Sequence, residues 1–428
     1  MLTIPILFII LHAYPKFEMH EFHTHRLSNG ISIIHQRIAY SEVAHCGLVV
    51  NAGSRDETVE QQGLAHFIEH VLFKGTKKRK SFHILNRLET VGGELNAYTT
   101  KEETAIYASF MNSYYERAFE LISDILFNAT FPEKELEKEK EVIIDEINSY
   151  RDNPLEQIHD DFEDSVFPDH PLGHTILGTF KSVKKFKRKD ILQFIKQNYY
   201  TNQMVFSSVG NVPFEDVLKL AEKYLAPIPK NIHTNKRKPF FGYKPSFNRI
   251  KKDTFQSHCV IGNLGYENKS RKKTGLVLLN NILGGPGMNS RLNLAIREKY
   301  GFTYNLESNY SAYQDTGLFT VYLGTDNNYL DKSMQLVHKE LKKLRNVKLG
   351  TLQLKQAKQQ LIGQIAMSQE NKSNLMLALG KSLLTYGKVD SLPRTYKKIE
   401  IVTSKDLLEI ANEVFEEKKL STLIFEGK

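Results

Sequence analysis

The sequence predicts an α+β or α/β sandwich that is built twice along the chain. Its 428 residues are too many for a single hydrophobic core, which favours two domains of about 200 residues each. Segments with strand-like alternation are mixed with segments of helical period, as in folds that pack helices on a sheet. Two short segments of the first half also recur in the second half, which favours a duplicated domain.

The elements of the first half have the clearer patterns. From Met19 onward, MHEFHTHRLSNGISIIHQ begins an alternating strand pattern. The segment GELNAYTTKEETAIYASF predicts two strands that are joined by a short polar turn. Periodicity predicts strands at 30–37, at 45–52 and twice within 93–110, and helices at about 60–73, 81–91, 114–128, 133–151 and 182–199.

The second half repeats part of this series. AHCGLVVNAG at 44–53 is similar to SHCVIGNLGY at 257–266, and GLAHFIEHVL at 63–72 aligns with GLVLLNNILG at 275–284 at nearly the same spacing. Between the two copies lies a stretch that is rich in Pro and Lys and has no period, which is typical of a linker. The predicted organisation is a first domain at 19–225, a linker at 226–250 and a second domain at 251–428.

Composition and charge favour a soluble globular protein and disfavour nucleic-acid binding. The chain is 41% hydrophobic and 25% charged, close to the average of globular proteins. Its net charge of +9 is spread along the chain, and basic runs such as KGTKKRK are balanced by acidic runs such as EKELEKEKE. After the first few positions there is no apolar run long enough to span a membrane, so no membrane span is expected.

The cysteines and the N-terminus bear on localisation. Cys46 and Cys259 each lie in an apolar, strand-like run, which predicts buried free thiols and fits a reducing compartment. Residues 1–18 are apolar but lack a basic flank and a small-residue cleavage site. This segment is either an atypical export signal or sequence upstream of a working start at Met19. We prefer the second interpretation, and therefore expect a cytoplasmic protein.

The segment GLAHFIEHVLFKGT, residues 63–76, places two histidines and a glutamate in an apolar run. Residues three and four apart share one face of a helix, so His66, Glu69 and His70 should lie side by side. Neutral imidazoles at this spacing can bind zinc, and a glutamate beside the metal can take a proton from bound water. The motif is His-x-x-Glu-His, the inverse of His-Glu-x-x-His. By itself the motif does not exclude an alternative, in which two packed histidines lie beside a surface glutamate and no metal is bound.

The second copy lacks this triplet, because Leu278, Asn281 and Ile282 stand at the equivalent positions. Only the first half would therefore carry the chemistry.

A third ligand is available in EKEKEVIIDEINSY, residues 137–150. Glu139 and Glu146 are seven residues apart on one predicted helical face, interleaved with Val142 and Ile143, which should point toward a core. An inward-facing carboxylate needs a partner, and a metal ion is one such partner. On so charged a helix, solvated glutamates are the alternative.

Several longer motifs resemble one family. The runs GLAHFIEHVLFKGTKKR, GGELNAYTTKEETAIY, EVIIDEI and NSRLNLAIREKYGFTY are similar to those of the pitrilysin family of zinc peptidases, the inverzincins. Within that family they are most similar to the catalytic subunit of the mitochondrial processing peptidase and its bacterial relatives. The resemblance covers nearly the whole chain from about residue 20. It implies an α+β fold of two duplicated α/β sandwich domains, each an antiparallel-rich sheet covered by helices, that together form one half of a clamshell.

The resemblance also implies a metal centre in the first domain. His66, His70 and Glu146 would bind zinc, with one ion per chain and none in the second domain. Glu69 would be the general base, and Glu139 would orient the site from behind the ligands.

Four further residues match family positions that bind substrate. Asn96 and Ala97 would lie on an edge strand that takes up an extended peptide as an added strand. Arg297 and Tyr304 match an Arg and a Tyr that act near the scissile carbonyl. Histidines without a matching position are expected to be structural or surface residues, namely His83, His159, His170 and His174.

The predicted function is a zinc metalloendopeptidase that hydrolyses peptides or unfolded protein segments with a zinc-bound water and a glutamate base. The resemblance implies that two such half-shells close around a chamber, as a homodimer or as a heterodimer with a related chain. The alternative is a non-catalytic peptide-binding or assembly subunit of a processing-peptidase-like complex. Such subunits typically lose part of the His-x-x-Glu-His set, whereas this chain keeps all of it.

Overall fold

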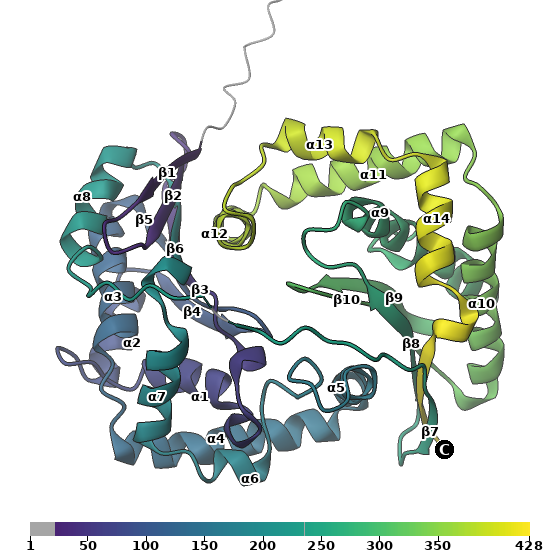
Figure 1. Ribbon diagram of the computed structural model, residues 1–428, viewed down its shortest axis with the longest axis horizontal. Coiled ribbons are helices and arrows are strands. Elements are labelled where there is room, and N and C mark those ends of the chain that lie inside the picture. The colour runs from purple at the N-terminus through teal and green to yellow at the C-terminus, as the bar shows by residue number, and fades with distance from the viewer. Residues whose placement is uncertain (1–21, 235) are drawn as a thin grey trace, which may run out of the picture.

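The computed structural model describes residues 22–234 and 236–428, and it has two halves, each with one β-sheet and covering helices (Figure 1). The predicted extension at 1–18 lies outside the described residues. This arrangement confirms the α+β fold of two sandwich domains that the sequence predicts.

The first sheet has six strands in the order β1-β2-β6-β3-β5-β4. β2 and β6 are parallel, and every other neighbouring pair is antiparallel. The central strands β3 and β6 are almost entirely buried because helices cover both faces of the sheet, which explains their nearly continuous apolar sequences. The strands are β1 (Phe22–Arg26), β2 (Ser32–Arg37), β3 (Val43–Val50), β4 (Glu94–Thr99), β5 (Thr104–Met111) and β6 (Met204–Gly210).

The second sheet repeats this topology with five strands in the order β7-β11-β8-β10-β9. The five strands correspond in order to β2-β6-β3-β5-β4 of the first sheet. In this sheet, too, one neighbouring pair is parallel, β7 with β11, which corresponds to β2 with β6, and the other pairs are antiparallel. The structure therefore confirms the duplication, with β1 as an addition to the first sheet. The strands are β7 (Phe247–Lys251), β8 (Ser257–Gly265), β9 (Thr303–Ala312), β10 (Gly317–Thr325) and β11 (Ser421–Glu426).

Fourteen α-helices pack around the two sheets in the described part of the chain. Those of the first half are α1 (Leu64–Leu72), α2 (Ser81–Glu89), α3 (Tyr115–Asn128), α4 (Glu133–Asp152), α5 (Pro154–Val166), α6 (Phe180–Val183), α7 (Arg188–Asn198) and α8 (Phe214–Tyr224). Those of the second half are α9 (Lys273–Gly284), α10 (Leu330–Asn346), α11 (Thr351–Ser368), α12 (Lys372–Tyr386), α13 (Leu392–Glu400) and α14 (Ser404–Val414).

The two halves exchange one helix each. α5 packs against β8 and β11 of the second sheet, where Phe162 is buried with Val260 and Phe425. α12 packs against β3 and β6 of the first sheet, where Met376 is buried with Val205. Each sheet is therefore packed against a helix from the other half (Figure 1).

Most predicted elements of the first half are present, with differences in three regions. The predicted helix at 182–199 is two helices, because the Asp190 side chain accepts a hydrogen bond from the Lys187 backbone N–H and starts α7 as a new helix. β7 begins at Phe247, inside the range predicted as linker, because its backbone pairs with β11. α5, β6 and α8 are further elements of the first half that were not predicted from its sequence.

Both cysteines are buried and free, as predicted, so they contribute to the cores and form no disulfide. In the described ranges, none of the helices has both the length and the apolar composition that crossing a bilayer requires.

Candidate metal centre

The start of α1 is fixed by a buried carboxylate and a close backbone crossing. Glu57 accepts hydrogen bonds from the backbone N–H groups of Gly63 and Ala65, at 2.9 and 2.7 Å. Gly63 has a φ of +90°, and a Cβ at this position would lie 2.6 Å from the carbonyl oxygen of Leu177. Gly178 approaches equally closely, since its Cβ would lie 2.3 Å from the carbonyl oxygen of Gln62. These contacts fix the position of the helix that carries the two histidines.

α1 directs its apolar face into the core and its polar residues to the opposite side. Leu64, Phe67 and Ile68 are completely buried in the first-half core. His66 and His70 lie one turn apart and their rings are in edge contact, with centroids 4.5 Å apart. The predicted helical register of the triplet is therefore present.

The two imidazoles meet a carboxylate from α4. The Nε2 atoms of His66 and His70 are 3.2 Å apart, and Glu146 Oε2 lies 3.8 Å from the first and 3.6 Å from the second. In the described part of the chain, these three residues form the only group of three or more His, Cys, Asp or Glu residues that could hold a metal ion, and their ligand atoms all lie within 4.8 Å of one another. The structure thus brings together the three residues that the sequence analysis predicted as ligands.

The donor set fits zinc. Bonds of about 2.0–2.2 Å to a tetrahedral ion place neighbouring ligand atoms about 3.3–3.6 Å apart, close to the distances found here. Glu146 Oε2 is buried and has no hydrogen-bond partner among the described residues. A buried carboxylate oxygen of this kind needs a cation or a hydrogen-bond donor, and the two imidazole nitrogens beside it are lone-pair donors to a metal.

The protonation preferences of the ligands differ. Burial, and secondarily the neighbouring His70, lower the pKa of His66 to about 3, so this ring is neutral at physiological pH. Burial also acts to lower the pKa of His70, but its hydrogen bond to Glu139 and the nearby carboxylates outweigh burial and raise it. Burial raises the pKa of Glu146. Metal binding would favour the unprotonated form of each group.

Glu139 lies behind His70, on the side away from the other two ligands. Its Oε1 accepts a hydrogen bond from His70 Nδ1 at 3.0 Å, and its Oε2 lies 2.6 Å from Lys74 Nζ. A carboxylate accepts and does not donate, so Nδ1 carries the proton and Nε2 is left free for a metal. This arrangement fits the orienting role that the resemblance implies for Glu139.

Glu69 lies next to the ligands on α1. Its Oε2 is buried and has no hydrogen-bond partner in residues 22–234 and 236–428. Burial raises the pKa of Glu69, and the Thr99 hydroxyl and the nearby charge of His70 partly offset this effect. A carboxylate with a raised pKa and a free oxygen is suited to accept and release a proton near neutral pH.

The predicted peptide-binding strand lies at a sheet edge beside α1. Asn96 and Ala97 belong to β4, the last strand of the first sheet, and among the described residues they pair on one side only, with Tyr107 and Ile106 of β5. β4 also packs against α1. An extended peptide that paired with this edge would therefore run past the helix that holds the candidate ligands.

Arg297 and Tyr304 are placed away from the three candidate ligands, in the second half. Arg297 Cζ lies 5.0 Å from the ring centre of Tyr304, and both residues line a cavity of about 440 Å³ next to β9. The side chain of Tyr304 projects into solvent, with 77% of the residue exposed. In the described ranges, neither residue makes a hydrogen bond, ion pair or ring contact with His66, His70 or Glu146.

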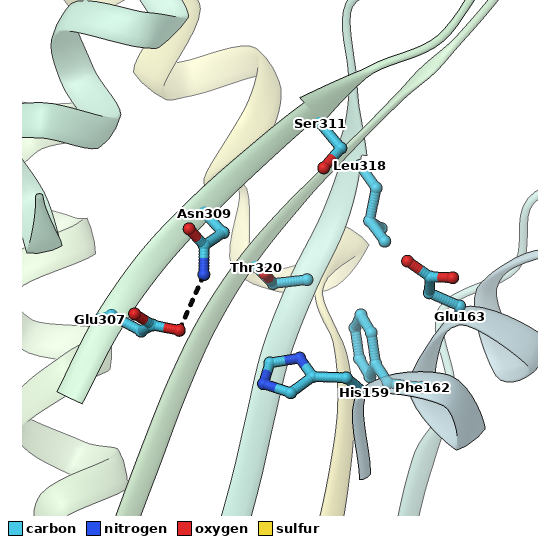
Figure 2. Close-up of a pocket in the computed structure, with 8 residues that line it drawn as sticks. All are labelled: His159, Phe162, Glu163, Glu307, Asn309, Ser311, Leu318 and Thr320. Atoms are coloured by element: carbon cyan, nitrogen blue, oxygen red, sulfur yellow. Dashed lines mark hydrogen bonds between the residues drawn. The ribbon is translucent and has the colours of Figure 1, made fainter. Parts of the chain in front are cut away.

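The other histidines lie outside the cluster. His83 is exposed on α2, whereas His170 is buried and bonds through Nε2 to the carbonyl oxygen of Lys238. His174 is partly buried. His159 lines a cavity of about 340 Å³ between α5 and the second sheet, where Glu163 and Glu307 also lie (Figure 2).

Three residues near the site were not identified from the sequence. Lys74 stands four residues after His70, and this spacing is the local signal that could have indicated it. Thr99 on β4 has a buried hydroxyl beside Glu69, and this hydroxyl acts to lower the pKa of that carboxyl group. Glu57 lies six residues before Gly63, too far for the usual capping pattern to indicate it.

One expectation for α4 was wrong. Ile143 is completely buried, but Val142, which was expected to point toward the core, is 49% exposed. The buried stripe of α4 runs through Leu136, Ile143 and Ile147. Val142 lies roughly 100° around the helix from Ile143 and thus beside the stripe.

Both halves of the chain match models of known protein families. Residues 32–180 match the family model described as Insulinase (Peptidase family M16), and residues 185–361 match the model described as Peptidase M16 inactive domain. The zinc protease YmxG of Bacillus subtilis (strain 168), described as uncharacterized, is 32% identical over 397 residues, covering 92% of this chain and 96% of that protein. The subunit beta of the mitochondrial-processing peptidase of Saccharomyces cerevisiae is 31% identical over 415 residues, covering 93% of this chain and 89% of that protein.

The fold is also similar to a solved structure, that of a protease from Helicobacter pylori. Its TM-score is 0.86 at 20% identity, and the match covers 95% of this chain and 100% of that chain.

Proposed function

Because the chain belongs to the insulinase family of peptidases, family M16, we propose that it is a zinc metalloendopeptidase that hydrolyses peptides or unfolded protein segments. The observation that carries the proposal is the convergence of His66, His70 and Glu146 around one point, with Glu69 beside them. Relatives named zinc proteases support the choice of metal. The same residues argue against a non-catalytic subunit, since the complete set of candidate ligands and base is retained.

In the proposed mechanism, His66 and His70 would hold the metal through Nε2, and Glu146 would hold it through Oε2. Zinc, when bound, supplies a Lewis acid that polarises the scissile carbonyl and makes water easier to deprotonate. Glu69 accepts a proton at its free oxygen from the attacking water and then delivers it to the leaving amine. Glu139 holds His70 in the tautomer that leaves Nε2 available.

The proposed substrate is an extended chain. A peptide that adds to β4 must adopt strand conformation, and it pairs through its backbone alongside Asn96 and Ala97. A folded substrate exposes few segments of this kind, so unfolded segments and short peptides should be preferred.

We further propose that the working site is completed by a second chain, either identical or related. Arg297 and Tyr304 are candidate catalytic residues, yet they lie in the second half, and Tyr304 is largely exposed. A partner whose metal centre faces this surface would use both side chains. The native mass of the purified chain tests this: a dimer supports the proposal, and a strictly monomeric, fully active chain contradicts it.

The function is tested with purified full-length protein and an unfolded polypeptide substrate. Hydrolysis should require bound zinc, cease after treatment with a chelator and return when zinc is added. Hydrolysis that persists in the chelator-treated, zinc-free protein would contradict the proposed function.

Glutamine substitutions should distinguish a ligand from an orienting residue. Glu146→Gln should sharply lower zinc occupancy, because a neutral amide oxygen replaces a charged ligand. Glu139→Gln should keep measurable zinc but weaken binding or activity by roughly 10–100-fold, as changes behind a ligand usually do. Zinc occupancy by metal analysis and peptide hydrolysis measure the two effects. Full zinc in Glu146→Gln together with loss in Glu139→Gln would mean that the two assignments are reversed.

A further inference from the structure

Lys74 is joined to the candidate metal centre through Glu139. Lys74 follows the end of α1 by two residues, and its Nζ lies 2.6 Å from Glu139 Oε2. The other oxygen of the same carboxylate accepts the hydrogen bond from His70 Nδ1 at 3.0 Å. Glu139 therefore bridges a cation on one side and a candidate ligand on the other.

The ion pair between Lys74 and Glu139 is well shielded from solvent. The Glu139 side chain is only 7% exposed, and that of Lys74 is 28% exposed. Within residues 22–234 and 236–428, no other Lys or Arg makes an ion pair with Glu139. The neighbouring Lys140 pairs instead with Glu137, at 2.7 Å. A carboxylate this buried is costly to keep charged without a cation beside it.

Lys74 and His70 hold opposite oxygens of one carboxylate. Glu139 Oε2 lies 2.6 Å from Lys74 Nζ, and Oε1 accepts the Nδ1 hydrogen of His70 at 3.0 Å. With its hydrogen on Nδ1, His70 leaves Nε2 free, the atom that faces His66 and Glu146. Without Lys74, one oxygen of this buried carboxylate would lose its partner, and the carboxylate could turn away from His70.

We propose that Lys74 is a positioning residue of the metal centre: its ammonium group holds the Glu139 carboxylate in the orientation that accepts the Nδ1 hydrogen of His70, so that His70 presents a free Nε2 to zinc. The proposal rests on the proposed function of the chain as a zinc peptidase. Lys74 acts through Glu139 and touches no ligand atom directly, so its effect is on metal affinity rather than on substrate binding.

The test is zinc affinity, measured by competition with a chelator on the full-length protein. Lys74→Met keeps the length and apolar stem of the side chain but removes the charge, and should weaken zinc binding about 10-fold. Lys74→Gln is a second uncharged variant and should behave in the same way. Lys74→Arg keeps the cation and should remain close to wild type. The Michaelis constant for a peptide substrate, measured at saturating zinc, should change little in all three variants.

Two controls separate positioning from a general structural or charge effect. Lys140→Met removes the same charge from the residue next to Glu139 without touching its carboxylate, and should bind zinc as tightly as wild type. In a Glu139→Gln background, Lys74→Met should have no further effect, because the bridge is already broken.

The proposal for Lys74 is overturned if Lys74→Met and Lys74→Gln bind zinc as tightly as wild type, or if Lys74→Met loses as much affinity in the Glu139→Gln background as alone. An absence of zinc binding by the wild type would overturn the proposed function, and the role of Lys74 with it. The two failures are therefore distinguishable.

Discussion

Glu69→Gln is expected to bind zinc like the wild type and to lose most peptide hydrolysis, by about 10²–10⁴-fold. Zinc should remain because His66, His70 and Glu146 are unchanged. Activity should fall because an amide has the size of a carboxylate but cannot accept the proton of the attacking water. Metal analysis and hydrolysis of an unfolded peptide, performed on the same preparation, give the two readouts.

A matched control for Glu69→Gln is Glu60→Gln, which removes an exposed carboxylate from the short 3-10 helix Val59–Gln61 just before α1. This variant should keep both its zinc and its activity. Near-normal turnover in zinc-loaded Glu69→Gln would remove this residue from the mechanism. Loss of zinc together with activity would instead give Glu69 a role in holding the metal.

Tyr304→Phe is expected to lower hydrolysis by about 10²–10³-fold, the usual effect of removing one donor to a developing oxyanion. Its zinc content should not change, because Tyr304 lies in the second half and, within the described ranges, makes no hydrogen bond or ring contact with the candidate ligands. Tyr300→Phe is the matched control: it removes a hydroxyl from a nearby ring that stacks on Phe302, and should have little effect.

A mixed dimer tests which chain Tyr304 serves. If it serves the partner's zinc, a Tyr304→Phe chain and a Glu69→Gln chain together assemble one complete site, with zinc and base from the first and the tyrosine from the second. Each variant alone should be nearly inactive, and the mixed dimer, isolated through two different tags, should recover a substantial part of one site's activity. No recovery in a verified mixed dimer would indicate that Tyr304 acts within its own chain or that the natural partner is another protein.

Local features of this protein were predictable from the sequence because their cause is local. The helical spacing of His66, Glu69 and His70 places them on one face of a helix whatever surrounds it. In the structure all three lie on α1, and the rings of the two histidines are in contact. Apolar runs in two segments likewise predicted buried strands with free cysteines. The duplication could be detected because two short segments in each half remain similar, and the order of the strands now supports it.

Features that depend on packing between distant segments were not predictable in the same way. Glu146 could be selected as the third ligand only through resemblance to a family, since the periodicity of α4 offered Glu139 and Glu146 equally. The exchange of α5 and α12 between the halves arises from contacts between segments that lie about a hundred or more residues apart in the sequence, which no local pattern indicates. The contact of Lys74 with Glu139 also forms only when α1 and α4 pack.

The most direct test of the central claim is the zinc content of the purified full-length chain and of a variant in which His66 and His70 are both replaced by Gln. The wild type should contain about one zinc per chain and should hydrolyse an unfolded peptide, whereas the double variant should lack both the zinc and the activity. A wild type without zinc, or a double variant that retains its full zinc content, would contradict the assignment of this centre.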